Sequence, residues 1–281
     1  MSAQASRAEL FQRLHQKDVF VVANATDAGS ARLLTGLGFP ALATTSAGLA
    51  YALGRADGAN LVTRDEALAN AAAIAAATRL PVSADLESGY GRTPAEVAET
   101  VRLAAEAGLV GCSIEDATGI PDAPVLSLAE AVDRVAAAVQ AARRLPFAFV
   151  LTARAENFLY GRPDLADTIA RLQAFEAAGA DALYAPGLPD AEAIRAVCSS
   201  VGKPVNVLAS PAVGSVAELA ALGVRRVSLG SAFARAALGG LLAAATEVVE
   251  HGTFGFLTGA PTYAQVNSLL AEHASPAEET R

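Results

Sequence analysis

Eight short apolar segments, each followed by a longer segment of helical character, recur along the whole length of this chain. Short strands that alternate with helices are typical of parallel α/β folds, in which the helices cover the sheet. Eight such units in a chain of 281 residues predict a (β/α)8 TIM barrel, a fold of typically ~250 residues. The expected strands span residues 20–22, 41–45, 81–84, 111–114, 147–152, 182–184, 204–208 and 226–229.

The sequence predicts a single barrel domain over residues 1–281, with a C-terminal helical extension from about residue 252. An open doubly wound sheet uses the same alternation, but no glycine fingerprint follows the first expected strand. Ser or Thr followed three residues later by Glu marks the starts of four helices. These start at Thr63, Thr93, Ser127 and Ser215, and glycines 108, 179 and 223 are expected to end helices. The last few residues are expected to be disordered.

The charge and composition exclude several classes of function. A formal net charge of −8 argues against binding to nucleic acid or to anionic membrane surfaces, which needs clustered basic residues. No apolar run of about 18 residues is apparent, and the N-terminus lacks the apolar core of a signal peptide. Cys112 and Cys198 are too few for a disulfide framework or a zinc site and are expected to be buried thiols. These features predict a soluble, cytoplasmic protein that acts on a small molecule.

The stretch from Pro81 to Gly91 gives the clearest chemical signal. Asp85 and Glu87 follow a short apolar run and precede a Gly-Tyr-Gly turn. Residues two apart in an extended strand point to the same side, so both carboxylates are expected to project together where the strand ends. In a barrel the carboxyl ends of the strands meet at one mouth, where catalytic residues lie.

Polar residues gather at the other expected strand ends as well. They are Asn24, Thr44, Thr45, Ser46, Glu115, Asp116, Arg154, Glu156, Asn206, Gly230 and Ser231. Carboxylates that converge without basic partners repel one another, and a divalent cation relieves that repulsion. Oxygen ligands without His or Cys predict Mg2+, with Mn2+ as the alternative. Arg154 is then expected to clamp an acidic group of the substrate.

The expected mouth lacks lysine and histidine. Lys17 lies outside the barrel and Lys203 at the wrong end of its strand, which argues against a Schiff-base mechanism. The histidines, which are His15, His251 and His273, all lie outside the strand ends, which argues against a histidine base or a zinc hydrolase.

Five motifs together resemble the isocitrate lyase/phosphoenolpyruvate mutase superfamily over nearly the full chain. They begin at Asn24 (Asn-Ala-Thr-Asp-Ala-Gly-Ser-Ala-Arg), Thr44 (Thr-Thr-Ser-Ala-Gly, with Asp57 downstream), Asp85 (Asp-Leu-Glu-Ser-Gly-Tyr-Gly), Ser113 (Ser-Ile-Glu-Asp) and Thr152 (Thr-Ala-Arg-Ala-Glu). The resemblance implies a Mg2+-dependent barrel that makes or breaks a C–C or C–P bond beside a 2-oxo acid, through an enolate held on the metal. It also implies a homotetramer, a dimer of dimers, in which the C-terminal segment packs on a neighbouring subunit.

The resemblance further implies a metal site made of four carboxylates. Asp85 is the expected direct ligand, and Asp57, Glu87 and Glu115 are expected to hold metal-bound water. Glu87 stands where the family usually has an aspartate, and its longer side chain is still expected to reach a water molecule.

The resemblance also implies a substrate site. The residues expected to contact substrate are Thr44, Thr45, Ser46, Asp85, Arg154 and Asn206, and Asn206 matches a position that helps to bind a second carboxylate. The residues expected to act in catalysis are Arg154, Glu115, Asp57 and Tyr90.

The segment after the fourth expected strand departs from the family. Lyases have a Lys-Lys-Cys-Gly-His run there, whose cysteine is the acid/base, and the phosphonate enzymes have a lysine and an asparagine. This chain has Ala-Thr-Gly-Ile-Pro-Asp-Ala-Pro at residues 117–124, and it also lacks a glutamate that the lyases place after strand six. The proton donor is therefore open among Tyr90, Tyr184, Thr118 and a metal-bound water.

The leading hypothesis is a Mg2+-dependent lyase acting on a C–C bond of a small 2-oxo or 2-hydroxy (di)carboxylic acid, similar to 2-methylisocitrate lyase or to an oxaloacetate-cleaving enzyme. The first alternative is a phosphonopyruvate hydrolase or mutase, which acts on a C–P bond. The second alternative is a barrel that binds a 2-oxo acid and Mg2+ without turnover.

Overall fold

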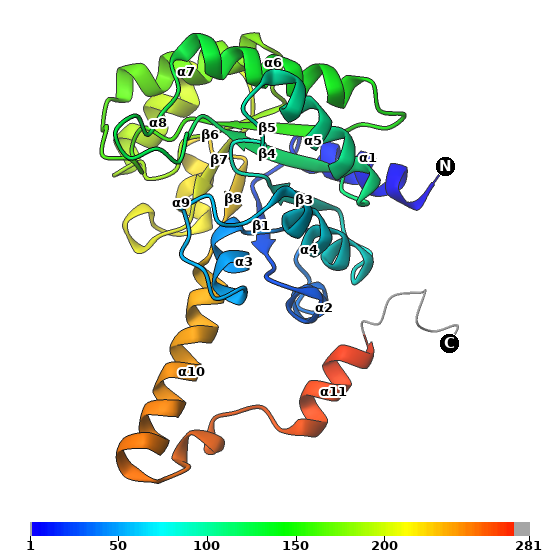
Figure 1. Cartoon of the computed structure of the whole chain (residues 1–281), viewed down its shortest axis with the longest axis vertical. Coiled ribbons are helices and arrows are strands. Elements are labelled where there is room, and N and C mark those ends of the chain that lie inside the picture. Colours follow the sequence, from blue (N-terminus) through cyan, green and yellow to red (C-terminus); the bar gives the residue numbers. More distant parts are fainter. Residues whose placement is uncertain (1, 273–281) are drawn as a thin grey trace.

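Eight parallel strands form a closed barrel in the computed structural model, which describes residues 2–272 (Figure 1). Each strand pairs with the next in chain order, and the last strand closes the sheet by pairing with the first, where Val22 lies opposite Ser228. The strands are β1 (Phe20–Asn24), β2 (Ala41–Ala43), β3 (Val82–Asp85), β4 (Gly111–Glu115), β5 (Val150–Arg154), β6 (Ala182–Tyr184), β7 (Val205–Leu208) and β8 (Arg226–Ser228). The predicted (β/α)8 barrel is confirmed, while His273 and the tail expected to be disordered lie outside the described residues.

Helices alternate with the strands, and those before α10 surround the barrel. The helices are α1 (Ala3–Leu14), α2 (Ala28–Gly36), α3 (Ser46–Ala52), α4 (Arg64–Ala76), α5 (Pro94–Glu106), α6 (Leu128–Arg143), α7 (Leu165–Ala177), α8 (Ala191–Ser200), α9 (Val216–Ala221), α10 (Ala232–His251) and α11 (Tyr263–Glu272). The four predicted capping boxes are present. In each, the Ser or Thr side chain accepts from the backbone N–H of the Glu three residues later, and the Glu side chain accepts from the backbone N–H of the Ser or Thr. Gly108, Gly179 and Gly223 have left-handed φ values of 91°, 99° and 98° just after their helices, as expected.

Side chains alternate along the strands between an apolar outer face and a polar inner face. On β5, Leu151 and Ala153 join the core that the surrounding helices share, while Arg154 lines a cavity inside the barrel. Because the alternation has a period of two, Thr152 faces the interior with Arg154. The strands thus supply both the core and the site.

Helix α1 closes the N-terminal end of the barrel. Its Phe11 packs edge-on against Phe20 of β1, with ring centroids 6.3 Å apart, and both rings belong to a small apolar cluster at this end. His15, which caps α1, lies edge-on between them and is buried. Helix α1 therefore packs against the N-terminal end of the barrel, opposite the mouth.

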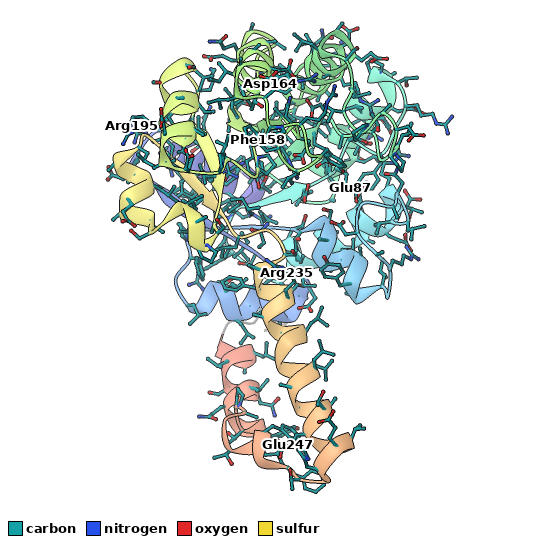
Figure 2. The ribbon with its side chains drawn as sticks, turned by 90° about the vertical axis from the view of Figure 1, so that its left-hand side faces the viewer. Glu87, Phe158, Asp164, Arg195, Arg235 and Glu247 are labelled. Atoms are coloured by element: carbon teal, nitrogen blue, oxygen red, sulfur yellow. The ribbon has the colours of Figure 1, made fainter. Side chains whose placement is uncertain are left out.

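Helix α10 does not cover the barrel but projects away from it, and α11 turns back toward α2 (Figure 1). We call α10 and the segment that follows it the arm. In Figure 2, Arg235 lies where α10 leaves the barrel, and Glu247 lies near the far end of the arm. Its Leu241 and Leu242 are 63% and 67% exposed. By length and composition alone α10 could cross a membrane, so the expectation that the chain holds no such apolar run is wrong.

Two elements differ from the sequence prediction by more than two residues. The fifth strand begins at Val150 instead of residue 147, because pairing with β4 starts where Gly111 lies opposite Val150. Helix α3 is not among the predicted helices; its N-cap is Thr45, whose side chain accepts from the Gly48 N–H at 3.2 Å. At seven residues it is too short to show a helical period in the sequence.

Candidate active site

Two adjoining cavities lie at the C-terminal ends of the barrel strands. The inner cavity, of about 150 Å³, reaches into the barrel, and the outer one, of about 290 Å³, lies among the loops that follow the strands. Ser46, Asp57 and Arg154 line both. The predicted residues of the inner cavity are Asn24, Thr44, Thr45, Ser46, Asp57, Asp85, Arg154, Tyr184, Asn206, Gly230 and Ser231, and those of the outer cavity are Ser46, Asp57, Glu87, Glu115, Arg154 and Glu156.

Arg154 is the centre of charge at this mouth. Its Nη1 binds Asp85 Oδ1 at 2.8 Å, its Nη2 lies 3.1 Å from Glu115 Oε2, and its Nε binds Glu156 Oε1 at 2.9 Å. The guanidinium also lies over the Tyr184 ring, 5.0 Å from its centroid. The expectation that the acids converge without a basic partner is therefore wrong for these three carboxylates.

Asp85 is held on its other side by the loop after β2. Ser46 donates to Asp85 Oδ2 from its backbone N–H at 3.3 Å and from its hydroxyl at 3.0 Å. Thr44 Oγ1 accepts from the Asp85 N–H at 2.9 Å. Asp85 is thus fixed at the point where β3 ends, facing both the serine and the arginine.

Glu87 lies in the loop after β3 and not on the strand, where its spacing from Asp85 predicted it. The strand ends at Asp85, and Glu87 and Tyr90 have left-handed φ values of 47° and 52°, so the two acids do not share one extended strand. The Tyr90 hydroxyl donates to Glu87 Oε1 at 3.1 Å. Burial, followed by the charge of Asp85, raises the pKa of Glu87 to about 7.

Arg134 of α6 fixes the loop that carries Glu87 and Tyr90. Its Nη1 donates to the Arg92 carbonyl at 3.0 Å, and its Nη2 donates to the carbonyl of Ser88 at 2.8 Å and also to that of Gly91. No local sequence pattern indicates this role, because the arginine lies more than 40 residues from the loop it holds.

Asp57 and Glu115 have raised pKa values for the same physical reason. Burial is the largest cause in both, since it disfavours the charged form of a carboxyl group. The charge of Asp85 raises the pKa of Asp57 further, and the charge of Glu156 raises the pKa of Glu115. The charge of Arg154 lowers both pKa values. Five carboxyl groups therefore surround one arginine, and that cation does not balance them.

The donor set fits a hard cation held mainly through water. No three His, Cys, Asp or Glu side chains within residues 2–272 converge closely enough to ligate one ion together. Mg2+ usually keeps several waters and binds one or two carboxylates directly. The excess negative charge suits such a hydrated ion. Asp57 lines both cavities, whereas Glu87 and Glu115 line the outer one, of about 290 Å³, and Asp85 lines the inner one. Asp85, Asp57, Glu87 and Glu115 are the residues that would hold the ion.

Asp116 does not belong to the mouth, contrary to the sequence prediction. Its Oδ2 binds Arg171 Nη1 at 2.9 Å and its Oδ1 accepts from the Glu156 N–H at 2.8 Å. Because Asp116 follows Glu115, the alternation along the strand turns its side chain outward toward α7.

The other predicted substrate residues are already engaged in hydrogen bonds. Thr45 caps α3, and Thr44 supports Asp85. The Asn206 amide accepts from Arg226 Nε at 2.9 Å and donates to Ser228 Oγ at 2.9 Å. Arg226 was not predicted as a site residue, although its spacing of two from Ser228 on β8 places both on the inner face.

The short loop after β4 is internally bonded. Ala117 and Val125 form an isolated antiparallel bridge, and the Thr118 hydroxyl donates to the Ala123 carbonyl at 2.6 Å. Asn60 Nδ2 reaches the Thr118 carbonyl at 3.5 Å. Thr118 is thus committed to the loop, which weakens its candidacy as a proton donor.

Comparison with known proteins places the chain in a family. The sequence profile of phosphoenolpyruvate phosphomutase matches residues 11–249. An uncharacterised protein of Mycobacterium tuberculosis is 35% identical over 223 residues, covering 79% of this chain and 81% of the relative. An oxaloacetate decarboxylase of Paraburkholderia xenovorans LB400 is 33% identical over 232 residues, covering 80% of this chain and 75% of the relative.

Solved structures agree with the sequence comparisons. A crystal structure described as a lyase/mutase from Burkholderia cenocepacia J2315 is 56% identical, with a TM-score of 0.92 over 96% of this chain and 97% of that one. Oxaloacetate acetylhydrolase with oxalate is 27% identical, with a TM-score of 0.85 over 96% and 94%, and the same enzyme is also known with the inhibitor 3,3-difluorooxalacetate. A phosphonopyruvate hydrolase complex with oxalate and Mg2+ is 25% identical, with a TM-score of 0.85 over 98% of each chain. The chain therefore belongs to the phosphoenolpyruvate phosphomutase family, within the isocitrate lyase/phosphoenolpyruvate mutase superfamily.

Proposed function

We propose that this protein is a Mg2+-dependent lyase that cleaves a C–C bond of a small 2-oxo diacid, with oxaloacetate as the leading substrate. The observation that carries the proposal is the group of five carboxyl groups around Arg154 at the barrel mouth. The names of two relatives, an oxaloacetate decarboxylase and an oxaloacetate acetylhydrolase, support this choice of substrate class. Mn2+ is the alternative ion, because the donors are all oxygen atoms.

Binding of the substrate begins with its acidic group. A guanidinium has five N–H donors, and Arg154 donates one to Asp85 and one to Glu156, while its Nη2 also forms an ion pair with Glu115. Two donors are left for a substrate carboxylate in the cavity. Ser46, whose hydroxyl and backbone N–H both donate to Asp85 Oδ2, lines the cavity beside them. Mg2+, when bound at the acids, supplies a Lewis acid for the 2-oxo group.

For oxaloacetate the C3–C4 bond breaks, C4 leaves as CO2, and the electron pair moves into the enolate of pyruvate. A proton must then reach C3. Tyr184 is the best placed candidate, because it lines the inner cavity beside Arg154, and burial raises its pKa to about 12, so it keeps its proton. Tyr90 instead donates its proton to Glu87 and lines neither cavity.

Phosphonopyruvate hydrolysis is the second candidate, favoured by the likeness to the phosphonopyruvate hydrolase complex. The loop at residues 117–124 weakens it, because no lysine or asparagine is present there to meet a phosphonate.

Product identification separates these candidates. The purified protein is incubated in the presence of Mg2+ with one substrate at a time: oxaloacetate, 2-methylisocitrate or phosphonopyruvate. The products are identified by NMR. Metal-dependent formation of pyruvate, or of oxalate and acetate, from oxaloacetate supports the proposal. Phosphate released from phosphonopyruvate alone supports the second candidate. Tight binding of oxalate with no turnover of any substrate would identify a binding protein and overturn both.

A further inference from the structure

Arg226 is buried at the inner end of the cavity and has no carboxylate beside it. It is the first residue of β8, it is 5% exposed, and its side chain lines the same inner cavity as Arg154. Its hydrogen-bond partners among residues 2–272 are Asn206 and His15, and it takes part in no ion pair there. Burial lowers the pKa of Arg226 to about 10, so the side chain stays charged at neutral pH.

The two partners of Arg226 are neutral. His15 Nδ1 lies 2.8 Å from the Phe11 carbonyl, which can only accept, so the proton is on Nδ1 and Nε2 accepts from Arg226 Nη1 at 3.2 Å. Burial and the charge of Arg226 lower the pKa of His15 to about 3, so the imidazole is uncharged. A buried charge that only neutral groups solvate is unfavourable unless a counter-charge can bind.

Arg226 also fixes the orientation of Asn206. The arginine donates to Asn206 Oδ1 at 2.9 Å, so the amide nitrogen is turned toward Ser228 Oγ at 2.9 Å and the cavity that both residues line. The floor of the cavity thus presents the N–H groups of a guanidinium and an amide, together with a hydroxyl. The mouth is the opposite, since Arg154 there meets three carboxylates.

The size of the inner cavity limits what can occupy it. At about 150 Å³ the cavity is smaller than the ~300 Å³ at which pockets for drug-sized ligands begin, which restricts the occupant to a short-chain acid.

The family resemblance implies that Asn206 helps to bind a second carboxylate. We propose that Arg226 completes this anion site on the floor of the inner cavity, where it binds the distal carboxylate of the substrate beside Asn206 and Ser228. This rests on the proposed function, which places the 2-oxo end at Arg154, Asp85 and Ser46. A diacid then bridges the two arginines, whereas a monoacid leaves Arg226 without an anion. Arg226 is therefore the residue that selects diacids over monoacids.

Calorimetric titration of the Mg2+-loaded protein with two ligands tests the assignment. Oxalate is the short probe for the mouth, and 3,3-difluorooxaloacetate adds a carboxylate beyond it. Arg226→Gln keeps a donor for Asn206 but removes the charge, and it is expected to weaken difluorooxaloacetate binding by about 30-fold or more, while oxalate binding changes less than about threefold. The affinity of Arg226→Lys for difluorooxaloacetate should fall between those of Arg226→Gln and the wild type, because lysine keeps the charge but lacks the bidentate guanidinium. Arg225→Gln, the same change at the exposed neighbouring residue, should alter neither ligand.

The melting temperature without ligand separates binding from a structural role. Because Arg226→Gln removes an uncompensated buried charge, it should melt at or above the wild-type temperature. A lower melting temperature together with equal weakening of both ligands would assign Arg226 to the fold and overturn the proposal. Unchanged difluorooxaloacetate binding in Arg226→Gln would overturn it while the proposed function stands. If the wild type binds neither ligand with Mg2+, the proposed function and the second anion site fall together.

Discussion

Asp85 is the residue on which the contacts of the mouth converge, since Ser46 and Arg154 bind its two oxygens. If it is the direct metal ligand, Asp85→Ala should reduce Mg2+-dependent turnover by at least about 100-fold, because metal-ion catalysis supplies several kcal/mol of transition-state stabilisation. The protein should stay folded, because Arg154 keeps two other carboxylates. Turnover against Mg2+ concentration, with circular dichroism as the check on folding, measures both.

Asp116→Asn is the matched control for that substitution. Asp116 is also a buried acid at the end of β4, but its partners are Arg171 and the Glu156 amide. The exchange should lower the melting temperature while the Mg2+ concentration needed for half-maximal turnover changes little. Equal loss of Mg2+ dependence in both variants would contradict the assignment of Asp85.

Glu87 predicts an unusual pH dependence of the metal-free protein. Its folded-state pKa, raised to about 7 from the ordinary 4.5, favours the protonated form, so ionisation is penalised only in the folded state. Stability is therefore lost as the pH rises from 4.5 through 7. Glu87→Gln should remove this loss and melt a few degrees above the wild type at pH 8, but not at pH 4.5. Melting curves with EDTA across this range test it, and a constant difference at all pH values would contradict it.

At the scale of elements, the loop of residues 86–92 is positioned by α6. Arg134 binds three of its carbonyls, and Thr100 Oγ1 of α5 binds a fourth, that of Gly89, at 2.7 Å. Arg134→Met should loosen the loop, weaken Mg2+ binding by about tenfold as loss of an outer-shell contact does, and leave the strands unchanged. Hydrogen exchange should rise at residues 88–92 alone. Arg102→Met on α5, which removes only exposed ion pairs, is the control and should change neither measurement.

What the sequence predicts about the elements depends on how local the cause is. The capping boxes and helix-ending glycines are local hydrogen-bond patterns, and the eight strands are runs of apolar residues, so both were predictable. Glu87 was misplaced because its left-handed φ depends on Arg134 and Tyr90. Asp116 was misplaced because it was counted with Glu115 at the strand end, although the alternation along β4 turns the two side chains apart. Its partner Arg171 lies 55 residues away. Arg226 was missed because only the closed barrel brings it to His15, which lies 211 residues earlier.

At the scale of the whole molecule, the arm formed by α10 and the following segment has an apolar surface with little to cover it. Leu241, Leu242 and Val249 are 63%, 67% and 85% exposed, and Glu247 fixes the turn after α10 by accepting from Thr253 and Phe256. We expect this surface to pack on a second copy of the chain within a homotetramer, as the family resemblance implies. A Leu241→Glu, Leu242→Glu double variant should then break the assembly. In a monomer these side chains would be in water, and the same substitutions would change its stability very little. Light scattering after size exclusion should show a smaller species whose melting temperature no longer rises with protein concentration. Leu241→Met, Leu242→Met keeps the apolar volume and should assemble like the wild type. A wild-type chain that elutes as a monomer would show that α10 projects freely into solvent.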